Sequence, residues 1–183
     1  MLRLYHGTDA ACADAICSGG FIYKPNNNHW LGNGVYFYTD LDLAKWWTTN
    51  PSSQFGTRVK NPAVIVFDID ISPDSILDLR TLSGYRKCIS LYSKYESIAF
   101  KNIEFEEISK KKQIRCSFFD FAFEYSKLSC VIGNFYLGNN AYLSCVPQNI
   151  LDELRRFNLP FIETQVCIKN GLDNGTIVDI IKE

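Results

Sequence analysis

Short apolar runs and segments with helical spacing follow one another along the whole chain. The apolar runs predict strands at 2–5, 35–38, 63–71, 129–132, 161–168 and 176–181. Apolar positions at helical spacing predict helices over 10–17, from 40 to about 49, and over 86–100, 118–125 and 147–157. Strict strand–helix alternation is absent, and no G-x-G-x-x-G follows the first strand. The pattern therefore predicts an α+β fold and argues against a Rossmann domain.

Turn and capping residues separate these segments. Thr8 or Asp9 can cap the first helix, which Gly19-Gly20 would end, and Thr39 or Asp40 can cap the second. The chain has 183 residues, of which 46% are hydrophobic and 14% aromatic. This composition supports a packed core and excludes a disordered chain. We expect a single domain over 1–183, with 77–127 as its least regular part.

The charge balance bears on the class of partner. The chain carries 19 Lys+Arg against 20 Asp+Glu, a formal net charge of −1. A protein that binds nucleic acid mainly through phosphate contacts is usually strongly basic, so composition does not favour a general nucleic-acid binder. The run Lys110-Lys111-Lys112 ahead of Arg115 is more typical of a solvated loop or helix end than of a binding patch.

Cysteine and histidine usage bears on compartment and metal chemistry. The seven cysteines are scattered without a C-x-x-C, which predicts buried free thiols in a reducing cytoplasm. His6 and His29 are the only histidines, and no ligand pairs have zinc-finger spacing, so we expect no metal. We find neither a signal-peptide h-region nor 18 consecutive apolar residues, and we expect a soluble protein without a membrane partner.

Three sequence features stand out as candidates for chemistry. His6 ends the first predicted strand and is followed by Gly7. About thirty residues later, a glycine-rich turn leads into an aromatic strand and then into a helix with Trp46-Trp47. The third feature is a predicted strand near the C-terminus that carries Glu163 and Gln165. Taken singly, each has a structural explanation as a cap, a tight turn or a core position.

Taken in order, these features resemble the donor site of the ADP-ribosyltransferases of the diphtheria-toxin and poly(ADP-ribose) polymerase branch. Small uncharacterised bacterial and phage proteins of this type are the nearest in pattern. The resemblance covers 4–47 and 160–170, and it implies that 77–127 is a helical elaboration. The residues that carry it are Tyr5-His6-Gly7-Thr8, the helix and the "G-L/F" strand at Phe21, the loop to Pro25, Leu31-Gly32-Asn33-Gly34-Val35-Tyr36-Phe37 and Thr164-Gln165-Val166-Cys167-Ile168.

The resemblance implies a split fold, in which two antiparallel-rich sheets with flanking helices surround an NAD cleft. His6 would bind the adenosine-side ribose, and Gly7 would present its backbone to the nicotinamide carboxamide. Tyr36 and Trp47, eleven residues apart, would hold the nicotinamide ring between them. The strand of His6 would neighbour the strand of Gln165. The other donor-contact candidates are Thr8, Gly34 and Lys24, with Arg3 a more remote candidate for the diphosphate and His29 for donor or acceptor.

Two positions depart from the family's pattern. Ala44 stands where a serine often supports the carboxamide, and Gln165 stands where a glutamate binds the nicotinamide ribose. Glu163 lies two residues before Gln165 and hence on the same strand face, so it could supply the carboxylate. We expect Gln165 at the ribose and Glu163 on the acceptor side, which gives His6, Tyr36, Gln165 and Glu163 as catalytic candidates.

The function implied is NAD-dependent mono-ADP-ribosylation of a macromolecular acceptor, which can be a protein or a nucleic acid. A toxin of a toxin–antitoxin or phage-defence system, with a neutralising protein partner, would fit such an enzyme. Three alternatives stay open: a catalytically silent NAD- or ADP-ribose-binding module, an NAD glycohydrolase that transfers to water, and a structural or interaction domain in which the motifs are coincidental.

Overall fold

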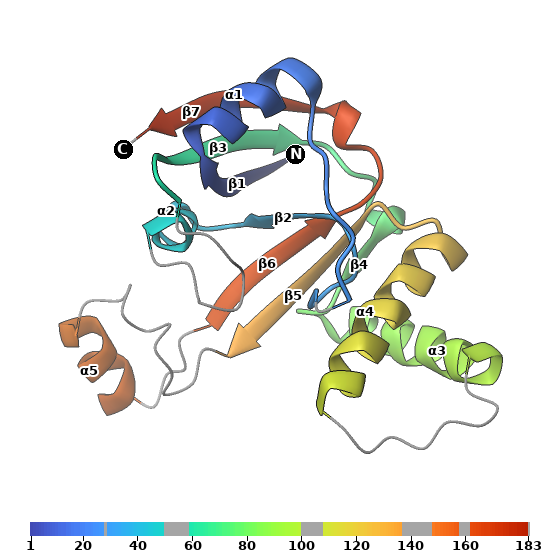
Figure 1. Cartoon of the computed structure of the whole chain (residues 1–183). Coiled ribbons are helices and arrows are strands. Elements are labelled where there is room, and N and C mark those ends of the chain that lie inside the picture. Colours follow the sequence, from blue (N-terminus) through green and yellow to red (C-terminus); the bar gives the residue numbers. More distant parts are fainter. Residues whose placement is uncertain (28, 50–58, 100–107, 137–147, 158–161, 183) are drawn as a thin grey trace.

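Seven β-strands form one mixed sheet that carries helices on both faces (Figure 1). The computed structural model describes residues 1–27, 29–49, 59–99, 108–136, 148–157 and 162–182. The strands are β1 (Leu2–Asp9), β2 (Val35–Tyr38), β3 (Pro62–Ile69), β4 (Ile76–Asp78), β5 (Cys130–Tyr136), β6 (Ile162–Ile168) and β7 (Gly175–Lys182). The helices are α1 (Ala10–Gly19), α2 (Leu41–Thr49), α3 (Leu82–Ala99), α4 (Ile108–Tyr125) and α5 (Gln148–Arg156), with short 3₁₀ helices at Pro73–Ser75 and Leu172–Asn174.

The order of the strands is β4-β5-β6-β2-β1-β3-β7. Neighbouring strands are antiparallel except for β4 and β5, which are parallel. In the described residues, β1 pairs with β2 through one residue pair, Tyr5 with Tyr38, whereas β1 pairs with β3 along its full length. The sheet thus consists of a β2-β6-β5-β4 half and a β1-β3-β7 half that are joined at one point.

This arrangement corrects two expectations from the sequence. The strands form one sheet by their pairing rather than two separate sheets. The strand of His6 does not neighbour the strand of Gln165, because β2 lies between β1 and β6. The mixed fold with mostly antiparallel strands is confirmed.

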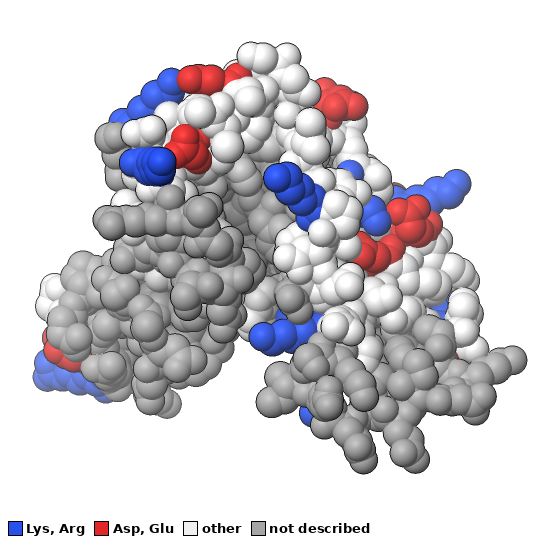
Figure 2. Space-filling model, in the orientation of Figure 1, with Lys and Arg blue, Asp and Glu red and all other residues white. Residues whose placement is uncertain are grey.

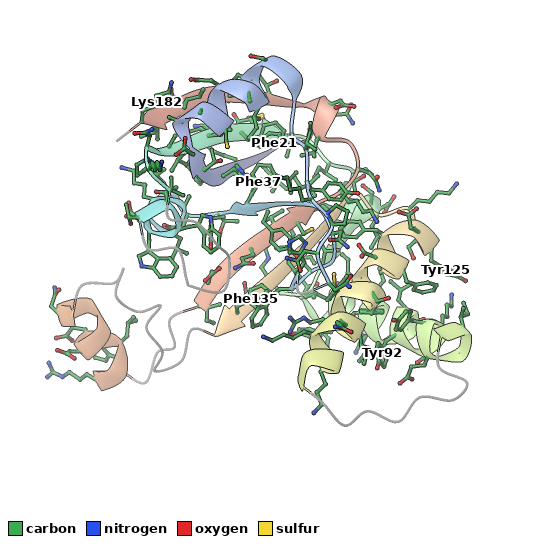
Figure 3. The ribbon with its side chains drawn as sticks, viewed as in Figure 1. Phe21, Phe37, Tyr92, Tyr125, Phe135 and Lys182 are labelled. Carbon is green, nitrogen blue, oxygen red and sulfur yellow. The ribbon has the colours of Figure 1, made fainter. Side chains whose placement is uncertain are left out.

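Each face of the sheet has its own apolar core. The Phe37 face, on which Leu4, Ile65 and Val166 also lie, packs against α1 through Ala13. On the opposite face, here called the Tyr36 face, Leu77, Val131 and Cys167 pack with aromatic residues of α3 and α4. Figure 3 shows Phe37 with Phe21 beside β1 and β2, and Tyr92 and Tyr125 at the α3–α4 pair.

Capping side chains fix two helix starts as the sequence predicts. Asp9 Oδ1 accepts a hydrogen bond from the Ala11 backbone N–H at 3.1 Å, and Asp40 Oδ1 accepts one from the Leu43 N–H at 3.0 Å. Asp9 also accepts hydrogen bonds from the backbone N–H groups of Lys60 and Asn61 through Oδ2. Because one carboxylate caps α1 and holds the chain entering β3, it fixes α1 against the β1–β3 pair.

Several predicted elements differ in extent. β1 runs four residues further than expected, because β3 pairs with it as far as Asp9. The basic run at 110–112 lies in the first turns of α4, which continues to Phe118 and beyond as one helix. The short strand β4 was not predicted, and residues 21–23 form no strand. The predicted elements at 86–100, 147–157 and 161–168 have terminal residues (100, 147 and 161) that lie outside the described residues.

The structure tests two of the sequence expectations, the burial of the cysteines and the lack of a membrane-spanning segment. The six cysteines in the described ranges are free. Cys116, Cys130 and Cys167 are buried as expected, but Cys12 and Cys17 are exposed on α1, so the expectation of buried thiols is wrong there. Cys145 lies outside the described residues. Within the ranges that the structure describes, no helix is long and apolar enough to cross a membrane.

Phe37 is the clearest test of the packing between the two halves of the sheet. Its ring is fully buried and lies 5.3 Å from the centroids of both Phe21 and Phe67. We expect Phe37→Ala to lower the free energy of unfolding by about 3–5 kcal/mol in urea denaturation. Ile22→Ala, at a side chain that is 85% exposed, is the control and should change it by less than about 0.5 kcal/mol. Equal effects of the two substitutions would contradict this account of the core.

Candidate functional site

The candidate site lies where β1 and β2 separate. Beyond the pair Tyr5–Tyr38, β1 continues along β3, and the backbone pairing between β1 and β2 is not continued. The His6 side chain takes up this gap, because its Nδ1 lies 2.8 Å from the backbone carbonyl oxygen of Tyr36. His6 and Tyr36, which are thirty residues apart in sequence, are therefore bonded directly across the opening between the two strands.

The surroundings of His6 fix its protonation state. Its ring lies 5.5 Å from the Phe21 centroid and 5.6 Å from the Phe37 centroid. Burial lowers the pKa of His6 below its ordinary value, against the opposing effect of the hydrogen bond to Tyr36. A carbonyl oxygen only accepts, so Nδ1 carries the proton and donates it, and Nε2 of the neutral ring keeps its lone pair. Nε2 bonds to no residue in the described part of the chain, and it can accept a hydrogen bond from a hydroxyl group.

Gly7 brings β1 into contact with α2 on the Tyr36 face. A Cβ atom built on Gly7 would lie 2.5 Å from the Ala44 carbonyl oxygen, 2.9 Å from Thr48 Cγ2 and 3.1 Å from Trp47 Cδ1. A larger residue would push the helix away, so glycine is required by packing at this position. The contact sets Trp47 next to Gly7, whereas Trp46 is buried in the core.

The hydroxyl of Tyr36 holds the glycine-rich turn that precedes β2. It accepts a hydrogen bond from the Leu31 N–H at 2.7 Å and donates one to the Gly32 carbonyl at 2.8 Å. Burial raises the pKa of Tyr36 far above its ordinary value. Gly34 lies against β6, because a Cβ atom built there would be 2.7 Å from Cys167 Sγ. The Tyr36 ring is thus fixed in place by its own hydroxyl, which is engaged within the fold.

A carboxylate of α4 anchors the same turn. Asp120 accepts hydrogen bonds from the Asn33 N–H at 2.8 Å and from Asn33 Nδ2 at 2.7 Å. Asn33 Oδ1 in turn accepts from the Asn26 N–H and lies 3.1 Å from His29 Nδ1. The His29 ring lies 5.3 Å from the Tyr36 ring, and burial lowers its pKa. This network ties the loop to α4 and sets His29 beside Tyr36.

Glu163 is a buried carboxylate on β6. Its side chain is 3% exposed, and burial raises its pKa, while hydrogen bonds from Gln165 and Tyr38 act in the opposite direction. Gln165 Nε2 donates to Glu163 Oε1. Because a carboxylate only accepts, the amide nitrogen of Gln165 must face it, and Gln165 Oε1 is turned away from Glu163. The pair therefore presents an oriented carbonyl oxygen, supported by a carboxylate behind it.

The sheet divides the predicted site residues between its two faces. Residue pairing along β1, β2 and β6 sets Tyr38 and Gln165 on the same face as Tyr36. The members of the Tyr36 face are Gly7, Gly34, Tyr36, Glu163 and Gln165, joined by Trp47 from α2. His6 and Thr8 point to the Phe37 face, where Thr8 is half-buried. The His6 ring contacts Phe21 and Phe37 there, and its bond to the Tyr36 backbone spans the gap between the two strands.

The cationic candidates are placed differently. Lys24 is exposed in the segment between α1 and β2. Arg3 forms a two-pronged ion pair with Asp68, at 2.9 Å from Nε and 2.8 Å from Nη2. An arginine that is already paired with a carboxylate is a poor candidate for a diphosphate, so Lys24 is the better of the two.

Comparisons with known proteins give limited information. No protein-family model matches the chain. An uncharacterized protein of the archaeon Methanocaldococcus jannaschii is 34% identical over 79 residues, which is 43% of this chain. The matched part is 37% of the archaeal protein, so the chain spans well under half the length of this relative. The similarity to this uncharacterized protein carries no activity to the chain.

Sequence reasoning missed three residues that shape the site. Tyr38 hydrogen-bonds Glu163, and Asn33 and Asp120 connect the turn to α4. Tyr38 could have been found, because it lies two residues after Tyr36 and hence on the same strand face. The Asn33–Asp120 contact joins residues 87 positions apart, and no local pattern predicts it.

The state of His6 can be tested by NMR, because the chain has two histidines. We expect the imidazole of His6 to titrate below 6.5, to be protonated on Nδ1 when neutral, and to be assigned by its loss in His6→Asn. Since its folded pKa is lowered, His6 should stabilise the fold above pH 6.5, and this contribution should be lost as the pH falls through the folded value. A His6 signal that titrates above 6.5 would contradict the burial that lowers its pKa, and a neutral ring protonated on Nε2 would contradict the bond to Tyr36.

Proposed function

We propose that this protein is an NAD-dependent mono-ADP-ribosyltransferase that modifies a macromolecule. The observation that carries the proposal is the neutral His6, held by the Tyr36 carbonyl in the opening between β1 and β2 with Nε2 able to accept. We also propose that the sheet, with its single-pair junction at Tyr5 and Tyr38, is the split sheet of the ADP-ribosyltransferases. These observations support the resemblance that the sequence motifs suggest.

The site residues fit the two ends of NAD. His6 Nε2 would accept a hydrogen bond from a hydroxyl of the adenosine-side ribose, and Lys24, with Thr8 near His6, would lie on the diphosphate side. On the Tyr36 face, the rings of Tyr36 and Trp47 would hold the nicotinamide, and the backbone of Gly7 would meet its carboxamide, with Gly34 immediately before β2. Both rings are fixed before binding, Tyr36 by its hydroxyl and Trp47 by the packing of α2 on Gly7, so little side-chain entropy is lost on binding.

The chemistry of the transfer needs orientation and charge more than a nucleophile. Breaking the bond between nicotinamide and ribose gives an oxocarbenium-like ribose and neutral nicotinamide, and a negative group nearby stabilises this state. In the proposed site Gln165 Oε1 would accept from the nicotinamide-ribose hydroxyl. Glu163 would orient the amide and supply negative charge from behind it. This differs from the expectation that Glu163 serves the acceptor, because its carboxylate is buried and bonded to Gln165.

We extend the proposal, on the resemblance alone, to the biological setting. An enzyme of this kind would act in the cytoplasm as a toxin of a toxin–antitoxin or phage-defence system, with a neutralising protein partner. NAD glycohydrolase activity and silent NAD binding are the outcomes against which the transferase is tested.

The proposal predicts a covalent label. The protein is incubated with whole-cell lysate and NAD that is labelled on the adenylate. It should release nicotinamide and leave stable label on a macromolecule. Protease or nuclease digestion then shows whether the labelled macromolecule is protein or nucleic acid. His6→Asn should keep a donor for the Tyr36 carbonyl but lose the acceptor at Nε2, so it should fold normally and release little nicotinamide. Nicotinamide release without a labelled macromolecule would indicate a glycohydrolase, and NAD binding without release a silent module.

The Glu163–Gln165 pair gives a second prediction. Gln165→Ala should abolish transfer, and Glu163→Gln should lower kcat by about 10²–10³-fold with little change in NAD binding. Burial raises the pKa of Glu163, so wild-type kcat should fall as the pH drops through this raised value, and Glu163→Gln should lack that limb. Thr164→Val, on the opposite strand face, is the control. Unchanged turnover in both Gln165→Ala and Glu163→Gln would remove this strand from the mechanism.

A further inference from the structure

Arg115 of α4 is a partly buried cation with two unpaired hydrogen-bonding atoms in the described residues. Its Nε and Nη2 atoms are shielded from solvent and have no hydrogen-bond partner in the part of the chain that the structure describes. Its Cζ lies 4.3 Å from the centroid of the Trp30 ring. Burial lowers the pKa of Arg115, but a guanidinium stays charged in proteins, and unpaired buried donors are costly. The side chain is therefore held in a state that an added acceptor would stabilise.

Two other arginines of the same protein show what this edge of the guanidinium binds. Arg3 donates from Nε and Nη2 to the two carboxylate oxygens of Asp68, and Arg80 does so to Asp78. The same two atoms are the unpaired ones in Arg115. For an anion to meet this shielded edge the Arg115 side chain must turn, and the attraction of a cation to a ring does not fix which N–H points outward. The edge suits a two-oxygen anion, such as a phosphate.

An aromatic side chain and a pocket adjoin Arg115. Trp30 is 42% exposed, although its ring also makes an edge contact with Phe135 at 4.9 Å. Arg115 also lines an open pocket of about 380 Å³, together with Tyr92, Lys111, Ile114 and Phe118. Its volume is in the range of sites for small ligands, about 300–1,000 Å³. An arginine, an exposed lysine and an exposed indole are thus gathered at one place.

This patch lies next to the Glu163–Gln165 pair. Phe135, which contacts Trp30, is the cross-strand partner of Glu163 on the Tyr36 face. Figure 3 shows Phe135 at the end of β5 and Tyr92 beside α3 and α4. A molecule that is bound on Trp30 and Arg115 would therefore reach the side of the pair where an acceptor must approach.

We propose that Trp30, Arg115 and Lys111 bind a single-stranded nucleic acid, with a base on Trp30 and a phosphate on Arg115 and Lys111. The bound strand is then the acceptor of the transferase, a role that rests on the proposed function. Aromatic stacking combined with backbone cations is how proteins bind unpaired strands, and it needs no large basic surface. Figure 2 shows basic and acidic side chains interspersed over the described part of this face, so the binding is local. An acidic protein segment would use the cations but would gain less from the exposed indole.

Binding is measured first without NAD, so that it does not depend on the proposed function. Fluorescence anisotropy with fluorescein-labelled 12-nucleotide single-stranded DNA and RNA, the matched duplex and a poly-glutamate peptide should show preference for a single strand. Arg115→Gln and Trp30→Ala should each weaken this binding at least tenfold, Trp30→Phe should retain most of it, and Lys111→Gln should lower the salt dependence by about one unit. The matched charge control is Arg156→Gln, an exposed position on α5, which lies away from α4 in Figure 1.

The hydrogen bond between Tyr92 and Glu96 gives a variant of opposite sign. The Glu96 carboxylate accepts from the hydroxyl of Tyr92, and Tyr92 lines the pocket. Glu96→Gln should strengthen binding of the single strand, because it removes a negative charge there. This result would not follow from misfolding, so it keeps the test decisive if Arg115→Gln proves unstable.

The outcomes separate the site from the activity. The site would be overturned by equal losses of binding in Arg115→Gln and Arg156→Gln, or by no binding of either single strand. It would also be overturned if the duplex or the peptide bound as tightly as the single strands. Single-strand binding that Arg115→Gln abolishes, together with transfer of labelled ADP-ribose to the oligonucleotide, supports both proposals. Binding without any nicotinamide release supports the site and overturns the proposed activity. Transfer to protein without oligonucleotide binding overturns the site alone.

Discussion

The candidate site depends on one hydrogen bond, between His6 Nδ1 and the Tyr36 carbonyl. Two halves of a sheet that are joined at Tyr5 and Tyr38 would leave an opening with unpaired backbone groups. The imidazole satisfies one of them, and in doing so it fixes its own tautomer. The same contact thus satisfies an unpaired backbone carbonyl and leaves Nε2 as a hydrogen-bond acceptor. A structural need and a chemical property coincide in one side chain, so the presence of His6 alone does not distinguish a binding protein from an enzyme.

The glycines show the same overlap between packing and function. Gly7 is required because α2 approaches its backbone, and Gly34 because β6 does. Gly32 has a positive φ of 86° and lies against Phe119 of α4. Each therefore has a sufficient reason in the fold, independent of any ligand. The proposed function gains its support from what these contacts place together, which is a fixed tyrosine, a tryptophan and an oriented amide on one face of the sheet.

Much of the fold could be predicted from sequence, because local signals determine it. The caps at Asp9 and Asp40, the strand Val35–Tyr38 and the helix that follows it agree with the pattern. The order of strands could not be predicted, since pairing between β2 and β6 joins segments far apart in sequence. The beginning of α4 was also missed, because its lysine-rich first turns resemble a solvated loop while tertiary packing of its later aromatic residues stabilises the whole helix. For the site, some residues that the motifs selected share the Tyr36 face, whereas Thr8 lies on the other face and Lys24 is exposed in the segment before β2, and the Asp120 anchor was not predicted.

In the proposed transferase, the pair of Glu163 and Gln165 would let a departure from the motif keep its chemistry. A glutamine in place of a glutamate loses the charge but keeps an accepting oxygen, provided that its amide is oriented. Here the orientation comes from Glu163, whose carboxylate accepts a hydrogen bond from the amide and is itself hydrogen-bonded by Tyr38. Burial makes this carboxylate costly to ionise, so its charge is most effective where neighbouring donors stabilise it. The negative charge that the chemistry needs would then lie one side chain further from the ribose, which predicts a slower transfer that is more sensitive to pH than one with a glutamate in direct contact.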